Sequence, residues 1–291
     1  MLFLVRATLL SAALLTPARA AGEPSGSIVL SEKLAAWKQE IEASGEGRIV
    51  LARIHVRDGA YLLPAGMEER HTLSRFFSQY DFRSQFVRTH ALNLNVDYPK
   101  RLSFVLLNMD RVKESQASEE ELISHELGHV WLHWRGLRAP ALAPGMLGCE
   151  AIHTGDIVQH ILIRQEQTRR GLESKKGWLA DLEKAYQTLS KEPGELTAPS
   201  DLCLRLLRLS LVIDIRMGLA EGEWEHREEY IDRLTRTDPL LTDLATRLIR
   251  LLSAFDLGNR IEYYAGLGAV RSASTLLIQQ LVEKSTPPVL R

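Results

Sequence analysis

The chain has 291 residues, of which 45% are hydrophobic and 25% are charged, and its formal net charge at pH 7 is −1. This is the composition of an ordinary globular protein with enough apolar side chains for a sizeable core. The near-zero net charge argues against nucleic acid as a partner, because such a partner selects a clear excess of basic residues.

The first twenty residues have the pattern of a secretory signal peptide. Arg6 is followed by an apolar run, and Ala18-Arg19-Ala20 is a small-x-small sequence typical of a cleavage site. The run is short for a membrane anchor, and Pro17 interrupts it. We therefore expect a periplasmic or secreted protein, cleaved near Ala20, with no stable membrane insertion afterwards.

The next part of the chain is predicted to mix helix and strand. An amphipathic pattern predicts a helix, and several runs rich in β-branched and apolar residues predict strands. The helix is expected over 31–44, and the strands over 48–56, 59–63, 93–98 and 101–109. Aromatic side chains between these strands are expected to pack in a core: Phe76, Phe77, Tyr80, Phe82 and Phe86.

The strongest functional signal is a His-Glu-x-x-His motif formed by His125, Glu126 and His129. Ser118 followed by Glu121 is a capping box, so the motif is predicted to lie on a helix that begins at 118. Residues four apart on a helix share a face, which brings the two imidazoles together. Such a pair is typical of zinc ligands, and a catalytic zinc keeps one position for water.

Glu126 is predicted to be the general base of a zinc peptidase. Zinc lowers the pKa of a bound water toward about 7, so Glu126 could accept its proton while the oxygen attacks a peptide carbonyl. The competing interpretation is that His125 and His129 are satisfied by ordinary hydrogen bonds in a core, without a metal.

A third ligand is expected from the helix predicted over 149–164. The Pro/Gly-rich loop 139–148 turns the chain back, so this helix can pack against the motif helix. Glu150 is the preferred ligand, and His153 and Asp156 are the alternatives. Residues eligible to stabilise an oxyanion are Tyr61, His153, His160, Tyr263 and Tyr264.

The sequence His-Glu-Leu-Gly-His-Val-Trp-Leu-His over 125–133, followed by Glu150 on a predicted helix, resembles the gluzincin branch of the HExxH zinc metallopeptidases, or zincins. Its local sequence, over residues 118–159, is most similar to that of ImmA/IrrE-type peptidases. The resemblance implies one zinc ion held by His125, His129 and Glu150, with Glu126 as general base. It also implies that a strand at the sheet edge pairs with an extended substrate, and we assign this role to 102–109.

Cys149 and Cys203 are the two cysteines of the chain. In an oxidising compartment they are expected to form an intramolecular disulfide. The alternatives are two buried thiols, or a thiolate ligand at Cys149.

After residue 160 the pattern is almost wholly helical. We predict an α+β fold, mostly α, with a small N-terminal β-sheet, a zincin-like active-site helix and an α-helical C-terminal bundle. The predicted parts are a signal peptide over 1–20, a zincin-like metallopeptidase domain over 21–170 and a helical region over 171–291 packed on it. The helices are expected either to pack behind the site or to form the far wall of a cleft.

The sequence thus predicts an exported zinc-dependent peptidase that acts on a peptide or protein substrate. The alternative is a non-catalytic helical binding or scaffold protein of the envelope, in which the motif holds a structural or vestigial metal.

Overall fold

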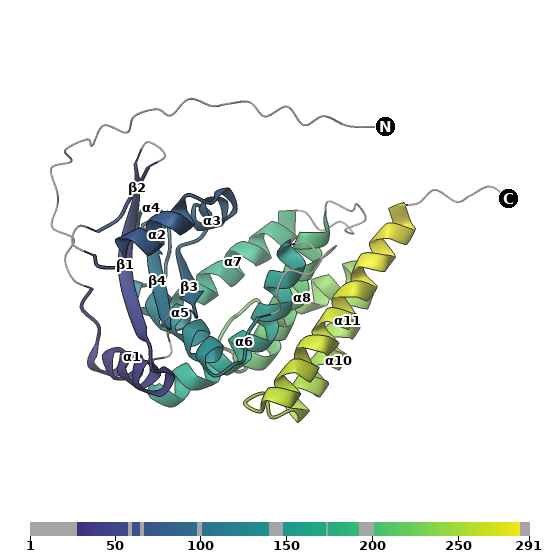
Figure 1. Ribbon diagram of the computed structural model, residues 1–291. Coiled ribbons are helices and arrows are strands. Elements are labelled where there is room, and N and C mark those ends of the chain that lie inside the picture. The colour runs from purple at the N-terminus through teal and green to yellow at the C-terminus, as the bar shows by residue number, and fades with distance from the viewer. Residues whose placement is uncertain are drawn as a thin grey trace, which may run out of the picture.

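The structure is a computed structural model that describes residues 28–57, 60–64, 67–97, 101–139, 148–172, 174–191 and 201–285. The predicted signal peptide and most of the loop 139–148 lie outside these residues. The fold is α+β and mostly α, as predicted, with a small sheet in the N-terminal part and helices throughout the C-terminal part (Figure 1).

The sheet has four strands in the order β2-β1-β4-β3, namely Ala60–Leu62, Arg48–Arg57, Leu102–Asn108 and Ala91–Val96. β1 runs parallel to β4, whereas β2 and β3 are antiparallel to their neighbours. The assignment of residues 102–109 to a substrate-binding sheet edge was therefore wrong, because β4 lies between β1 and β3. The strand next to β4 at the edge of the sheet is β3.

Helices cover both faces of the sheet. α1 (Glu32–Gly45) and α5 (Glu119–Trp134) pack on one face, where Val105 of β4 contributes to the shared core. α2 (Arg70–Phe77) and α3 (Tyr80–Phe86) pack on the other. A short helix α4, Met109–Val112, leads from β4 toward α5. Most of the predicted aromatic cluster lies in the second core, namely Phe77, Phe82 and Phe86, whereas Tyr80 is exposed.

The C-terminal part is built from six helices among the described residues, and they surround one large apolar core. α6 lies at the junction, because it packs on α5 as well as on α8 and α11 (Figure 1). Within the described residues, no helix is both long enough and apolar enough to cross a membrane. The helices are α6 Gly148–Arg170, α7 Lys176–Lys191, α8 Leu202–Gly218, α9 Arg227–Thr237, α10 Pro239–Ala254 and α11 Arg260–Ser285.

α6 and α8 run side by side in the same direction. A disulfide joins Cys149 to Cys203 near their N-terminal ends, with Cα atoms 5.6 Å apart. Eleven residues further along each helix, His160 faces Asp214. The equal offset of the two contacts means that the helices are parallel and in register.

Candidate metal centre

The helix that carries the motif begins where its capping residue predicts. Ser118 has an extended backbone, and its side-chain oxygen accepts a hydrogen bond from the backbone N–H of Glu121 at 3.1 Å. Acidic residues in the first turn oppose the positive end of the helix dipole. Gly136 follows the last turn with a φ of +78°, a conformation that glycine adopts without strain. α5 is thus a well-defined helix that holds the motif against the sheet.

The motif approaches α6 closely because Gly128 has no side chain. A Cβ atom at this position would lie 2.6 Å from Cγ2 of Ile163, which is far too close. The two helices can therefore pack tightly at this point. His160, about one turn before Ile163 on α6, is brought onto the histidine pair of α5.

His125, His129 and His160 form a group that can hold a metal ion. One ligand nitrogen from each lies within 4.8 Å of the other two, and all three side chains are partly buried. Nε2 of His125 and Nε2 of His129 are 3.3 Å apart. Two nitrogens bound to zinc at the usual distance, in a tetrahedron, are separated by about 3.3 to 3.4 Å. The spacing of this pair therefore fits a shared ion.

The tautomer of His129 follows from a hydrogen-bond chain. The amide nitrogen of Gln159 donates to the backbone carbonyl of Leu137 at 3.1 Å and to the hydroxyl of Tyr263. Since a carbonyl only accepts, this contact orients the Gln159 amide and leaves its oxygen to accept from Nδ1 of His129 at 2.9 Å. In the neutral imidazole of His129 this contact places the proton on Nδ1, so Nε2, which faces His125, is the nitrogen with the lone pair that a metal ligand requires.

The carboxylate of Asp214 lies close to the ring of His160. Its Nδ1 lies 3.7 Å from Oδ2 of Asp214, and Asp214 also forms an ion pair with Arg164. Asp156, one turn earlier on α6, lies 3.9 Å from Nε2 of His160. Burial alone would lower the pKa of His160, but the nearby carboxylates of Asp214 and Asp156 raise it above its ordinary value. A histidine backed by a carboxylate is a common arrangement around protein-bound metals.

The pKa of His125 is shifted in the opposite direction. Burial lowers it well below its usual value, and the neighbouring His160, His129 and Arg164 lower it further. His125 is therefore neutral at pH 7, which is the protonation state that can bind a metal.

Glu126 is held from the side of the sheet. Its carboxylate is buried, and Oε2 accepts a hydrogen bond of 2.7 Å from the side-chain amide of Asn93 on the edge strand β3. Glu126 follows His125 directly in the motif and lies about 100° further round the helix.

The group contains His160 and does not include the preferred third ligand, Glu150. Glu150 is buried in the first turn of α6, ten residues before His160. That separation corresponds to roughly 15 Å along a helix, so the side chains of Glu150 and His160 are too far apart to bind one metal ion. His153 is also outside the group, whereas Asp156 is close to it through His160. His160 was expected only among the oxyanion candidates, and its spacing from the motif carried no signal of ligation.

The tyrosines considered for oxyanion stabilisation serve other contacts. Tyr61 stacks on Phe77 in the core beneath α2. The hydroxyl of Tyr263 donates to the carbonyl of Arg138, and that of Tyr264 donates to the carbonyl of Gly136. The last two therefore fasten α11 to the segment that follows the motif helix.

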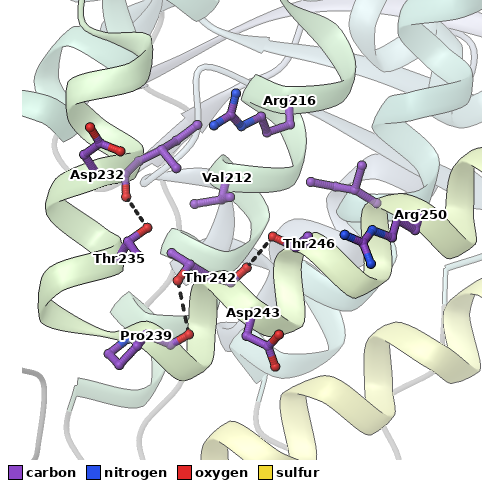
Figure 2. A pocket seen from close by; sticks show the side chains of 11 residues that line it. Val212, Arg216, Asp232, Thr235, Pro239, Thr242, Asp243, Thr246 and Arg250 are labelled. Carbon is purple, nitrogen blue, oxygen red and sulfur yellow. Dashed lines mark hydrogen bonds between the residues drawn. The ribbon is translucent and has the colours of Figure 1, made fainter.

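A separate cavity of about 680 Å³ lies among α8, α9 and α10 (Figure 2). None of its lining residues belongs to the histidine group. The hydroxyls of Thr235, Thr242 and Thr246 donate to backbone carbonyls of their own helices, so these polar groups are already satisfied within the protein. The cavity therefore has no evident connection with the metal centre.

Comparisons with protein-family models, with characterised proteins and with solved structures found no match.

Proposed function

We propose that the protein is a zinc-dependent peptidase whose metal is held by His125, His129 and His160, with Glu126 as the general base. The observation that carries the proposal is the convergence of three imidazoles from two helices, two of them from the helix that also carries Glu126. His160 replaces Glu150 in the ligand set derived from the resemblance. We also propose that the chain is exported, as the pattern of residues 1–20 predicts.

A divalent ion bound here would supply Lewis acidity, lowering the pKa of a water molecule and polarising a peptide carbonyl. Glu126 would take the proton from the water and deliver it to the departing amine. Asn93 would hold Oε2 of Glu126 by its hydrogen bond, and the other carboxylate oxygen would accept and release the proton. Gln159 and Asp214 would hold His129 and His160 in their ligand orientations.

The substrate would enter along β3. This strand is at the sheet edge beside the motif helix, and it carries Asn93, which contacts the general base. An extended peptide could add to this edge by backbone hydrogen bonds, which is a common mode of peptide recognition. The substrate class we propose is therefore a peptide or protein segment in extended conformation.

The test is metal analysis followed by peptide hydrolysis. We expect the purified protein to bind about one zinc ion per chain, and His160→Ala to lose it. Glu150→Gln is the matched control from the same helix and should keep the metal. Glu126→Gln should also keep the metal but lose activity by about 10²- to 10⁴-fold. Equal hydrolysis by Glu126→Gln and the native protein would refute the catalytic assignment.

One observation favours the alternative of a non-catalytic protein with a structural metal. Asp156 lies 3.9 Å from Nε2 of His160, so it could complete a closed set of four ligands with no position for water. Asp156→Asn distinguishes the two. A catalytic site should keep its zinc and its activity in this variant, whereas a closed structural site should lose zinc about as readily as His160→Ala does.

A further inference from the structure

Polar side chains form a continuous line between the sheet and α5. Asn93 and Asn95 are two apart on β3, so both lie on the same face of the sheet, and Ser103 of β4 is the direct partner of Asn95 in the strand pairing. That face packs on α5. The line ends on α5 itself, at Glu126 in the motif and at Trp134 two turns later.

The four hydrogen bonds along this line all run in one direction. The indole N–H of Trp134 donates to the hydroxyl of Ser103 at 3.0 Å, and that hydroxyl donates to the amide oxygen of Asn95 at 2.6 Å. The amide nitrogen of Asn95 donates to the amide oxygen of Asn93 at 3.1 Å. The amide nitrogen of Asn93 donates to Oε2 of Glu126 at 2.7 Å.

The chemistry of the two ends determines this direction. An indole N–H can only donate and an ionised carboxylate can only accept. Ser103 has one proton, and because it accepts from Trp134 that proton goes to Asn95. Each asparagine amide then has a single orientation that satisfies both neighbours. Breaking the line at any point frees an amide to rotate and to present its oxygen to the carboxylate.

The far end of the line is firmly held. Trp134 is 9% exposed and Ser103 is fully buried. The indole of Trp134 packs against Gly45 and Gly47, where a Cβ atom would lie less than 3 Å from the ring. The donor that starts the line is thus anchored by the close packing of the turn between α1 and β1 against the end of α5.

We propose that Trp134, Ser103, Asn95 and Asn93 form a one-way hydrogen-bond relay that fixes the carboxylate of Glu126, and that Asn93 is a positioning residue for the reaction. The inference rests on the proposed function for its catalytic meaning, but the relay itself is a property of the folded chain. It links the general base to a tryptophan roughly 12 Å further along the same helix.

The kinetic test uses Trp134→Phe, which removes the donor and keeps an aromatic ring. Trp131→Phe is the matched control, because Trp131 lies on the same helix outside the relay. We expect Trp134→Phe to lower kcat on the order of 10- to 100-fold, the effect of a misplaced catalytic group, with KM and zinc content unchanged. Asn93→Asp, which replaces the terminal donor by an acceptor, should lower kcat at least as much. Trp131→Phe should leave kcat unchanged.

The second readout needs no activity and uses the metal-free protein. The indole N–H resonance of Trp134, observed by ¹⁵N NMR, should be protected from solvent exchange and should shift in Asn93→Asp, while that of Trp131 should not shift. An unchanged Trp134 resonance, or an unchanged kcat in folded Trp134→Phe, would overturn the relay. Absence of hydrolysis by the native protein would overturn the proposed function, whereas the NMR result would still decide the relay.

Discussion

Gly128 is the residue on which the close approach of α5 and α6, the helices that carry the histidine group, depends. A methyl group at this position would lie 2.6 Å from Cγ2 of Ile163, a fully buried β-branched side chain that has little freedom to move. Any side chain here therefore has to push α6 away from α5. His160 would move away from His125 and His129 together with α6.

We expect Gly128→Ala to destabilise the fold by about 1 to 3 kcal/mol, the usual effect of overpacking a core, and to weaken zinc binding as well. Ile163→Ala in the same chain should recover part of the zinc affinity, because it removes the group in conflict. Chemical denaturation and zinc titration measure the two effects. Unchanged zinc affinity in folded Gly128→Ala would show that the site does not need this close approach.

In the proposed site, His160 is the residue whose protonation should govern metal binding. Burial lowers its pKa, but Asp214 and Asp156 raise it more, so the metal-free protein keeps this proton to a higher pH than an ordinary histidine does. A metal has to displace the proton. We expect zinc affinity to fall as the pH is lowered, beginning above the ordinary histidine pKa of about 6.5.

Asp214→Asn tests this dependence, because it removes a carboxylate that raises the pKa. The fall in affinity should then begin at a lower pH, while the affinity at pH 8 drops by about 10- to 100-fold through loss of the group that orients His160. Competition with a chromophoric chelator across a pH series gives both values. Asp232→Asn, an exposed position in the separate cavity, is the control, and the same pH profile in both variants would contradict the assignment.

At the scale of elements, α6 and α8 are joined twice, by the disulfide near their N-terminal ends and by the His160–Asp214 contact further along. Removing both cysteines, as Cys149→Ser with Cys203→Ser, should destabilise the protein by about 2 to 4 kcal/mol, since the disulfide restrains a loop of the unfolded chain. Zinc affinity should change little, because the packing of the two helices remains. Denaturation without reductant checks the first expectation, and a large loss of zinc binding would contradict the second.

Most of the elements could be predicted from the sequence because their signals are local. Ser118 caps its helix as expected, the helix expected over 31–44 is α1, and the β-branched run at 48–56 is a strand. β4 also carried a usable signal: the run Phe104–Leu107 is buried without alternation, which is typical of an internal strand covered on both faces. That signal contradicts the sheet-edge assignment made for it.

The candidate site was only half predictable. His125, Glu126 and His129 lie on one helix, so a spacing of four is enough to bring the imidazoles together. His160 joins them only because α5 and α6 cross at Gly128 and Ile163, a tertiary contact that no local pattern encodes. Glu150 comes earlier on α6 and was preferred because it opens the helix that follows the Pro/Gly-rich loop, and the resemblance implied the same residue. The crossing point selects the later residue.

At the scale of the whole molecule, the candidate site lies where the two parts of the protein meet. α5 packs on the sheet and contributes two histidines to the group, and α6 packs on the C-terminal helices and contributes one. A bound metal would therefore link the sheet to the helical core. We expect zinc to stabilise the chain by about 2.7 kcal/mol at a free concentration a hundred times Kd.

Calorimetry checks this coupling. The metal-bound protein should unfold in one transition that covers both parts, and the transition temperature should rise with zinc concentration. His160→Ala should show no such rise, while Glu150→Gln should behave like the native protein. Two separate transitions, only one of them sensitive to zinc, would mean that the metal does not join the parts.

The position of Asn93 on the edge strand has a consequence for where a substrate would be cut. Side chains along a strand alternate between the two faces of a sheet. A peptide that pairs with β3 therefore keeps the same side chains toward the protein only if its register shifts by two residues at a time relative to Glu126. Cleavage products of a single substrate should accordingly differ in length by even numbers of residues.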